Sequence, residues 1–270
     1  MRRPALAIVL FCLYASIPAQ KFQYAPVSSD IILDRVENAP LGNEQRHTRL
    51  KQLFVQAGCY GPALTEQPVA GPDTANIICR LKGSSDESII VGAPYEQPST
   101  RQARDGWTAA ALLPSLYQSL TERKRRHTVV FIAFAAEANG QNGAELYVKN
   151  MTPSEIQQTE AMLSLKELGL SPTKVWTGHS DRDLVQALVV VTYALKLPLS
   201  QVDVDSDWSS EAFAARQIPR ITVHSLTAED VWSGRAAAFR PNNYVDSYRL
   251  LGGYLAYLDT VLKPKSEQRK

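Results

Sequence analysis

The stretch from Thr128 to Phe134, TVVFIAF, decides the fold. It is apolar after Thr128 and rich in β-branched side chains, which predicts a strand that is buried on both faces. Two runs of similar character precede it, residues 75–81 (ANIICRL) and 88–91 (SIIV). Strands that are buried on both faces belong to sheets that helices cover on each side. The three runs therefore predict an α/β architecture.

Stretches with helical periodicity alternate with strands along the rest of the chain. The expected helices are residues 43–57, 107–120, 143–148, 183–195 and 244–262, and the further expected strands are residues 161–165, a short stretch around Val202 and residues 220–224. This alternation predicts a mostly parallel mixed sheet with helices on both faces, a three-layer α/β sandwich. No long linker interrupts the pattern, so we expect a single domain. Its functional side chains should lie on loops at the carboxyl ends of the strands.

The first nineteen residues have the three parts of a secretory signal peptide. Arg2 and Arg3 form a basic start, an uncharged and mostly apolar run follows from Ala5 to Ser16, and Ala19 is a small residue at the cleavage point. The apolar run is shorter than the ~20 residues of a membrane-spanning helix. We therefore expect a signal peptide at 1–19, a mature domain at 20–270 and a secreted or periplasmic protein without a membrane span. An uncleaved anchor is the alternative.

Charge and motifs exclude several classes of function. The formal net charge is +2, and loss of Arg2 and Arg3 with the signal peptide makes the remaining chain neutral, which argues against a nucleic-acid partner. No G-x-S-x-G, G-x-G-x-x-G or P-loop occurs, so a serine-hydrolase elbow and a nucleotide site have no support. The basic run at residues 123–127 (RKRRH) is interpreted as a solvated turn, with phosphate binding as the second interpretation.

Cys59 and Cys79 are the two cysteines that remain after removal of Cys12 with the signal peptide. Two cysteines in an oxidising compartment are a natural disulfide pair. The alternative is two buried free thiols. We expect the disulfide.

Ten segments in chain order resemble the secreted zinc aminopeptidases of metallopeptidase family 28, among them DGWT at 105–108 and IPRITVHS at 218–225. The full set is residues 53–54, 57–59, 76–79, 89–93, 105–108, 112–117, 127–132, 172–176, 218–225 and 248–251. The resemblance runs along nearly the whole mature chain. It implies the zinc-aminopeptidase fold and a site with two zinc ions.

The resemblance also implies a set of site residues, of which this chain keeps few. Asp105 matches the bridging Asp ligand, and Glu137 matches the Glu that takes a proton from metal-bound water. The other four ligand positions hold residues that differ from the family's His, Glu, Asp and His: Pro94, Ala138, Lys166 and Trp232 or a neighbour of Trp232. Tyr95, Trp107 and Trp208 are candidates for lining the old substrate cleft, with burial in the core as the alternative.

These replacements predict a catalytically inactive pseudopeptidase with no resident cofactor, which binds a peptide or a small molecule in the old cleft. The alternative is an active metallo-aminopeptidase that cleaves N-terminal peptide bonds, with zinc held by Asp105, His224 and a third ligand and with Glu137 as general base. A third hypothesis is an interaction protein whose cleft is filled.

Lys166 suggests what replaced the metal. Two carboxylates that faced a cation would repel each other without it, and burying them unpaired is costly. We hypothesise an ion-paired cluster of Asp105, Glu137 and Lys166. The alternative is a Lys166 ammonium that extends into solvent.

Overall fold

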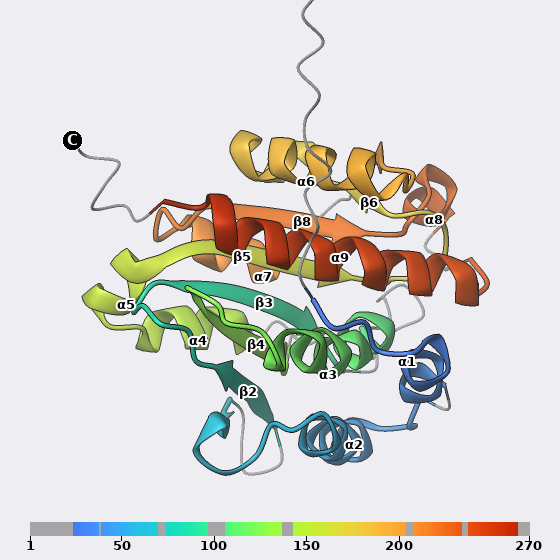
Figure 1. Cartoon of the computed structure of the whole chain (residues 1–270). Coiled ribbons are helices and arrows are strands. Elements are labelled where there is room, and N and C mark those ends of the chain that lie inside the picture. The colour runs from blue at the N-terminus through green and yellow to red at the C-terminus, as the bar shows by residue number, and fades with distance from the viewer. Residues whose placement is uncertain are drawn as a thin grey trace, which may run out of the picture.

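A computed structural model describes residues 24–37, 39–69, 74–96, 106–136, 143–203, 208–233 and 237–263 (Figure 1). The expected signal peptide at 1–19 lies outside them. The strands are β1 (Leu64–Pro68), β2 (Ala75–Leu81), β3 (Ser88–Pro94), β4 (Thr128–Phe134), β5 (Thr159–Lys166), β6 (Lys174–Val175), β7 (Ser200–Gln201) and β8 (Arg220–His224). The α-helices are α1 (Ser29–Val36), α2 (Asn43–Gln56), α3 (Trp107–Thr121), α4 (Gly143–Asn150), α5 (Pro153–Gln158), α6 (Arg182–Leu195), α7 (Trp208–Ala214), α8 (Ala228–Ser233) and α9 (Pro241–Val261).

The strands form one eight-stranded sheet in the order β1-β2-β4-β3-β5-β8-β6-β7. The central strands β4, β3, β5 and β8 are parallel to one another. At one margin β2 pairs antiparallel with β4 and with β1, and at the other β6 pairs antiparallel with β8 and parallel with β7. The predicted mixed sheet with a parallel centre is confirmed.

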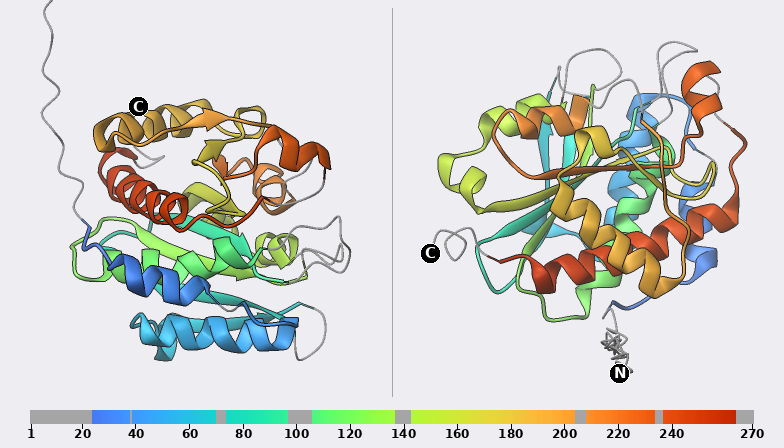
Figure 2. Two further views of the ribbon diagram at one scale, coloured as in Figure 1. Left: turned by 90° about the vertical axis from the view of Figure 1, so that its right-hand side faces the viewer. Right: turned by 90° about the horizontal axis from the view of Figure 1, so that it is seen from above.

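Side chains of successive strand residues enter two separate cores. Ile77, Val91 and Phe131 pack into a core that α1, α2, α3, α6 and α9 cover, while Ile78 and Ile132 pack into a second core with α4, α5 and α7. The helix layers lie on opposite faces of the sheet (Figure 2). This arrangement is the three-layer sandwich that the alternating strands and helices predict.

Most predicted elements agree with the structure, and the differences have simple causes. The expected strand at 161–165 extends over Thr159–Lys166, and the one around Val202 is a two-residue strand, Ser200–Gln201. The sequence patterns do not predict α1, β1, α5, β6 or α8. These elements are short, and β1 is a largely polar strand at the margin of the sheet that is held by backbone pairing with β2.

Cys59, which follows α2, and Cys79 in β2 form a disulfide. Both residues are fully buried. The predicted pair is confirmed, and the alternative of two free thiols is wrong. Within the described residues, no helix is long and apolar enough to cross a bilayer.

Candidate functional site

The carboxyl ends of the central parallel strands meet along one edge of the sheet, which we call the carboxyl edge. Lys166, the last residue of β5, lies opposite His224, the last residue of β8. Gly92 in β3 lies opposite Ser164 in β5, so Pro94 ends β3 at the same level. Open α/β sheets carry their binding and catalytic groups at this edge. The structure thus brings Pro94, Lys166 and His224 to adjacent strand ends.

Pro94 stands where the resemblance places the first His ligand. Its ring has no donor atom for a metal. The segment that leads into α3 packs closely against it, because a Cβ on Gly106 would lie 2.3 Å from the carbonyl oxygen of Pro94. Only glycine permits this approach. Asp105, the expected bridging ligand, precedes Gly106 and lies outside the described residues.

Lys166 brings a positive charge to the carboxyl edge. Its side chain is half-buried and ends β5, where the resemblance places an Asp ligand. An ammonium group has no lone pair for a metal and repels a metal cation, so Lys166 does not fit a zinc site. Glu137 and Ala138 follow β4 outside the described residues, and the same holds for the side chain of Trp232 in α8.

The backbone at the carboxyl edge is strained. Ala136, which follows β4, has φ 60°, and Glu167, which follows β5, has φ 37°. Both residues are buried. A left-handed conformation costs a non-glycine residue on the order of 1–3 kcal/mol, and such residues cluster at functional sites. The carboxyl edge therefore carries strained backbone after two of its strands, and Ala136 directly precedes Glu137.

His224 is buried and both of its ring nitrogens bond the backbone. The N–H of Leu226 donates to Nδ1 at 3.1 Å, so Nδ1 carries no proton. Nε2 then carries the proton and donates to the carbonyl oxygen of Val202 at 2.8 Å. A metal would have to displace one of these bonds. This geometry argues against His224 as the zinc ligand of the alternative mechanism. The described residues contain no group of three or more His, Cys, Asp or Glu side chains that could hold a metal ion.

Tyr95 and Trp107 are core residues, so they do not line a cleft. The Tyr95 hydroxyl donates to the carbonyl oxygen of Ala75 at 3.1 Å, and burial raises the pKa of Tyr95. The Trp107 Nε1–H donates to the carbonyl oxygen of Val36 at 3.0 Å. Both side chains are fully buried. The side chain of Trp208 lies outside the described residues.

Sequence analysis missed a buried lysine beside the carboxyl edge. Lys174 in β6 lies opposite His224, and its Nζ donates to Ser171 Oγ and, at 3.0 Å, to the Pro172 carbonyl oxygen. Burial lowers the pKa of Lys174. Ser171 Oγ in turn donates to the carbonyl oxygen of Ser225 at 2.5 Å. The bond from Ser171 to Ser225 ties the loop that follows β5 to the loop that follows β8. Residues 172–176 belong to the segments that resemble the family, but nothing in them marks Lys174 as buried, because β6 has only two residues.

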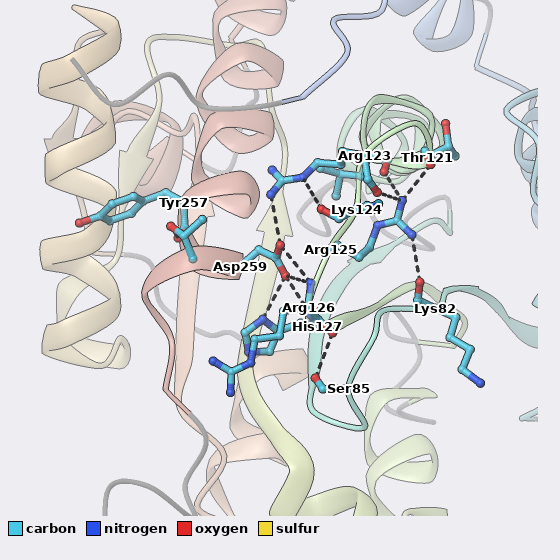
Figure 3. A network of polar contacts seen from close by, with 12 residues as sticks. Lys82, Ser85, Thr121, Arg123, Lys124, Arg125, Arg126, His127, Tyr257 and Asp259 are labelled. Atoms are coloured by element: carbon cyan, nitrogen blue, oxygen red, sulfur yellow. Dashed lines mark hydrogen bonds and ion pairs between the residues drawn. The ribbon is translucent and has the colours of Figure 1, made fainter. Parts of the chain in front are cut away.

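The basic turn before β4 is partly solvated, because Lys124 is exposed and Arg123, Arg125 and Arg126 are half-buried, and it is also held by contacts within the chain. The Arg125 guanidinium donates to carbonyl oxygens of the chain, at 2.9 Å to Lys82, 2.9 Å to Thr121 and 2.8 Å to Arg123 (Figure 3). His127 is fully buried. The turn is therefore a structural element at the amino end of β4.

Asp259 in α9 is the acceptor at the centre of this turn (Figure 3). Its carboxylate accepts from the Arg123 guanidinium at 3.1 Å, from the backbone N–H of Arg126 at 3.0 Å, and from His127 at 2.8 Å (backbone N–H) and 3.1 Å (Nδ1). Burial by itself would raise the pKa of Asp259. The hydrogen bonds from His127 and the charge of Arg123 outweigh burial and lower that pKa.

Comparison with known proteins identifies the architecture. The sequence profile of Peptidase family M28 matches residues 76–242. No curated protein sequence matches the chain.

Solved structures share the fold at low sequence identity. LapA of Legionella pneumophila is 15% identical with a TM-score of 0.72 over 87% of this chain and 74% of its own. A zinc aminopeptidase of Bacillus subtilis, BSAP, is 17% identical with a TM-score of 0.59 over 71% of this chain and 51% of its own, so the match spans about half its length. Glutaminyl cyclase of Porphyromonas gingivalis is 15% identical with a TM-score of 0.68 over 84% of this chain and 97% of its own.

Proposed function

Because the chain belongs to peptidase family M28, we propose that it is an exported aminopeptidase-like protein that has lost di-zinc catalysis. The observation that carries this proposal is the set of side chains at the carboxyl edge. Pro94 offers no donor, Lys166 offers a positive charge, and the ring nitrogens of His224 both bond the backbone. A zinc ion needs three or four nitrogen, oxygen or sulfur ligands. We propose that this edge binds a peptide or a small molecule without chemical conversion.

Export is the second part of the proposal. Residues 1–19 have the pattern of a signal peptide, and residues 20–270 would form the mature domain. The disulfide between Cys59 and Cys79 supports an oxidising compartment, either outside the cell or in the periplasm.

Lys166 would serve as the internal replacement for the metal charge. In this proposal its ammonium pairs with Asp105 and Glu137, which would otherwise repel each other. A double-mutant cycle of Lys166→Met and Glu137→Gln, measured by urea unfolding at pH 7, tests the pairing. We expect a coupling energy of about 1 kcal/mol or more. A coupling near zero would show that the ammonium lies in solvent.

An activity assay tests the loss of catalysis. The mature protein would be incubated with a panel of aminoacyl-coumarin amides and with peptides that begin with glutamine, since glutaminyl cyclases share this fold. Each reaction would be run with and without added zinc. We expect no turnover above that of Glu137→Gln, which is the matched control. Turnover that disappears in Glu137→Gln would establish an active enzyme and overturn the proposal.

A binding assay tests the remaining role of the carboxyl edge. Calorimetry with a library of short peptides should give at least one ligand whose affinity falls about tenfold, or 1.4 kcal/mol, in Lys166→Ala. Lys149→Ala, on the exposed side of α4, is the control and should leave the affinity unchanged. Equal affinities in both variants would place the ligand elsewhere.

A further inference from the structure

The outer face of α6 exposes large apolar side chains. Val189 is 50% exposed, Val190 is 42% exposed and Tyr193 is 86% exposed. They lie on adjacent turns of one helix, at the margin of the molecule formed by α6 (Figures 1 and 2). An exposed apolar cluster on a single element marks an interaction surface more often than scattered apolar residues do.

The packing of α6 does not require these side chains. Its inner face supplies Leu184, Leu188 and Val191 to the core. The Tyr254 hydroxyl of α9 donates to the Leu184 carbonyl oxygen at 2.7 Å and holds the helix in place. The core contacts of α6 are therefore complete without Val190 and Tyr193.

The outer face of a surface helix is normally polar or charged, as α2 shows. The exposed positions of α2 are polar apart from Val55: Glu44, Gln45, Thr48, Gln52 and Gln56. In contrast, α6 has no charged residue between Asp183 and Lys196. Its outer face is apolar at the centre and charged only near its ends.

This face is complementary to itself. Counted along the sequence, Gln186 and Tyr193 lie at equal distances on opposite sides of the midpoint between Val189 and Val190. The same holds for Asp183 and Lys196. All six residues of this set are exposed. When two copies of α6 pack antiparallel, valines meet valines at the centre. The Gln186 amide then faces the tyrosine of the other copy, and Asp183 of each helix approaches Lys196 of the other. A parallel pair would bring like charges together.

We propose that the outer face of α6 is the contact surface of a two-fold symmetric homodimer with antiparallel helices. Such a contact is isologous, because the same patch serves both subunits. A helix of 14 residues is about 20 Å long, which gives less than the ~800 Å² per partner of a standard interface. The dimer is therefore weak and reversible.

Sedimentation equilibrium of the full mature chain, from about 1 to about 500 µM, tests the proposal. We expect a monomer–dimer equilibrium in the wild type and a dissociation constant at least ~10-fold higher in Val190→Glu, which places a charge at the centre of the contact. Val55→Glu is the matched control, because Val55 is an equally exposed valine in a helix of the same length. It should dimerise like the wild type. Far-UV circular dichroism would confirm that each variant is folded.

Charge reversal tests the antiparallel arrangement. Asp183→Lys and Lys196→Asp should each weaken the dimer, and the two changes together should restore it. If the double variant dimerises more weakly than either single variant, the antiparallel arrangement is contradicted. A wild type that stays monomeric at every concentration, or dimers that Val190→Glu leaves unchanged, would overturn the proposal. A monomer that sediments with lipid vesicles would assign the face to a membrane and would overturn it too.

Discussion

The two ends of the central strands hold their charged groups in different ways. At the amino end of β4, Asp259 accepts hydrogen bonds from Arg123, Arg126 and His127, so opposite charges and donors surround one carboxylate. At the carboxyl edge, Lys166 is the last residue of β5, at a position where the family resemblance implies a metal ligand.

The backbone differs between the two ends as well. The basic turn at the amino end is held by hydrogen bonds from Arg125 to carbonyl oxygens. At the carboxyl edge Ala136 and Glu167 adopt left-handed conformations. One end thus contributes stability, while the other carries strained backbone. The comparison teaches that stabilising contacts and strained backbone lie at opposite ends of the same set of strands.

Asp259→Ala should have the largest effect, because it removes the common acceptor of the amino end. We expect the free energy of unfolding in urea to fall by about 3 kcal/mol, since the donors of His127 and the charge of Arg123 lose a partly buried partner. Asp246→Ala removes an exposed carboxylate that pairs with Arg249, and its cost should stay below ~0.5 kcal/mol. Equal losses in the two variants would show that the amino end is not specially stabilised.

Acid should lower the free energy of unfolding through protonation of Asp259. The pKa of Asp259 is lowered from 3.8 in the folded state, so the folded protein binds fewer protons than the unfolded chain. The stability that this provides is complete above the unfolded pKa of 3.8 and is lost as the pH falls through the lower folded pKa. In unfolding curves between pH 6 and about pH 2, the wild type should lose more stability than Asp259→Asn. Parallel pH profiles would contradict this linkage.

Ala136→Gly should relieve strain at the carboxyl edge. Glycine accepts φ 60° without a steric cost but adds freedom to the unfolded chain, so we expect a net gain of up to about 1 kcal/mol in thermal or urea unfolding. Ala135→Gly is the matched control next to it, at a buried residue without positive φ, and should lose about 1 kcal/mol. Destabilisation of the same size in both variants would show that Ala136 stores no strain.

Pro94→His should have the smallest effect on activity. In the proposal the new imidazole restores one ligand, while the positions assigned to Ala138, Lys166 and Trp232 or a neighbour of Trp232 still lack the ligands that the resemblance implies. We expect aminopeptidase activity and zinc content to equal those of Pro94→Ala, which removes the ring without adding a ligand. Activity that appears in Pro94→His alone would show that the assignment of ligand positions is wrong.

The sequence predicted those elements whose buried residues form a recognisable apolar pattern. The strands β2, β4 and β8 agree with their predicted ranges, because each contains buried β-branched residues, which in β4 form an apolar run after Thr128. The margin strand β1 was not predictable, since LTEQP has neither alternation nor an apolar run and relies on pairing with β2.

At the candidate site, the sequence predicted where along the chain the residues lie, but it did not predict their hydrogen bonds. It placed Pro94 and Lys166 in the region of the carboxyl edge. It could not show that the backbone groups of Val202 and Leu226 form hydrogen bonds with the two ring nitrogens of His224, because any residue type can supply a backbone group. Nor could it show that Asp259 lies among the basic residues of a turn more than a hundred positions away.

Zinc content per chain tests the central claim most directly. A chain of residues 20–270 would be dialysed against micromolar zinc and then against metal-free buffer, and its metal would be measured by elemental mass spectrometry. We predict that no zinc is retained, because the described residues of the carboxyl edge include no group of side chains that could hold a metal ion. About two zinc ions per chain, as a two-metal peptidase site requires, would contradict the loss of di-zinc catalysis. A single retained zinc would contradict it as well and would indicate a mononuclear site.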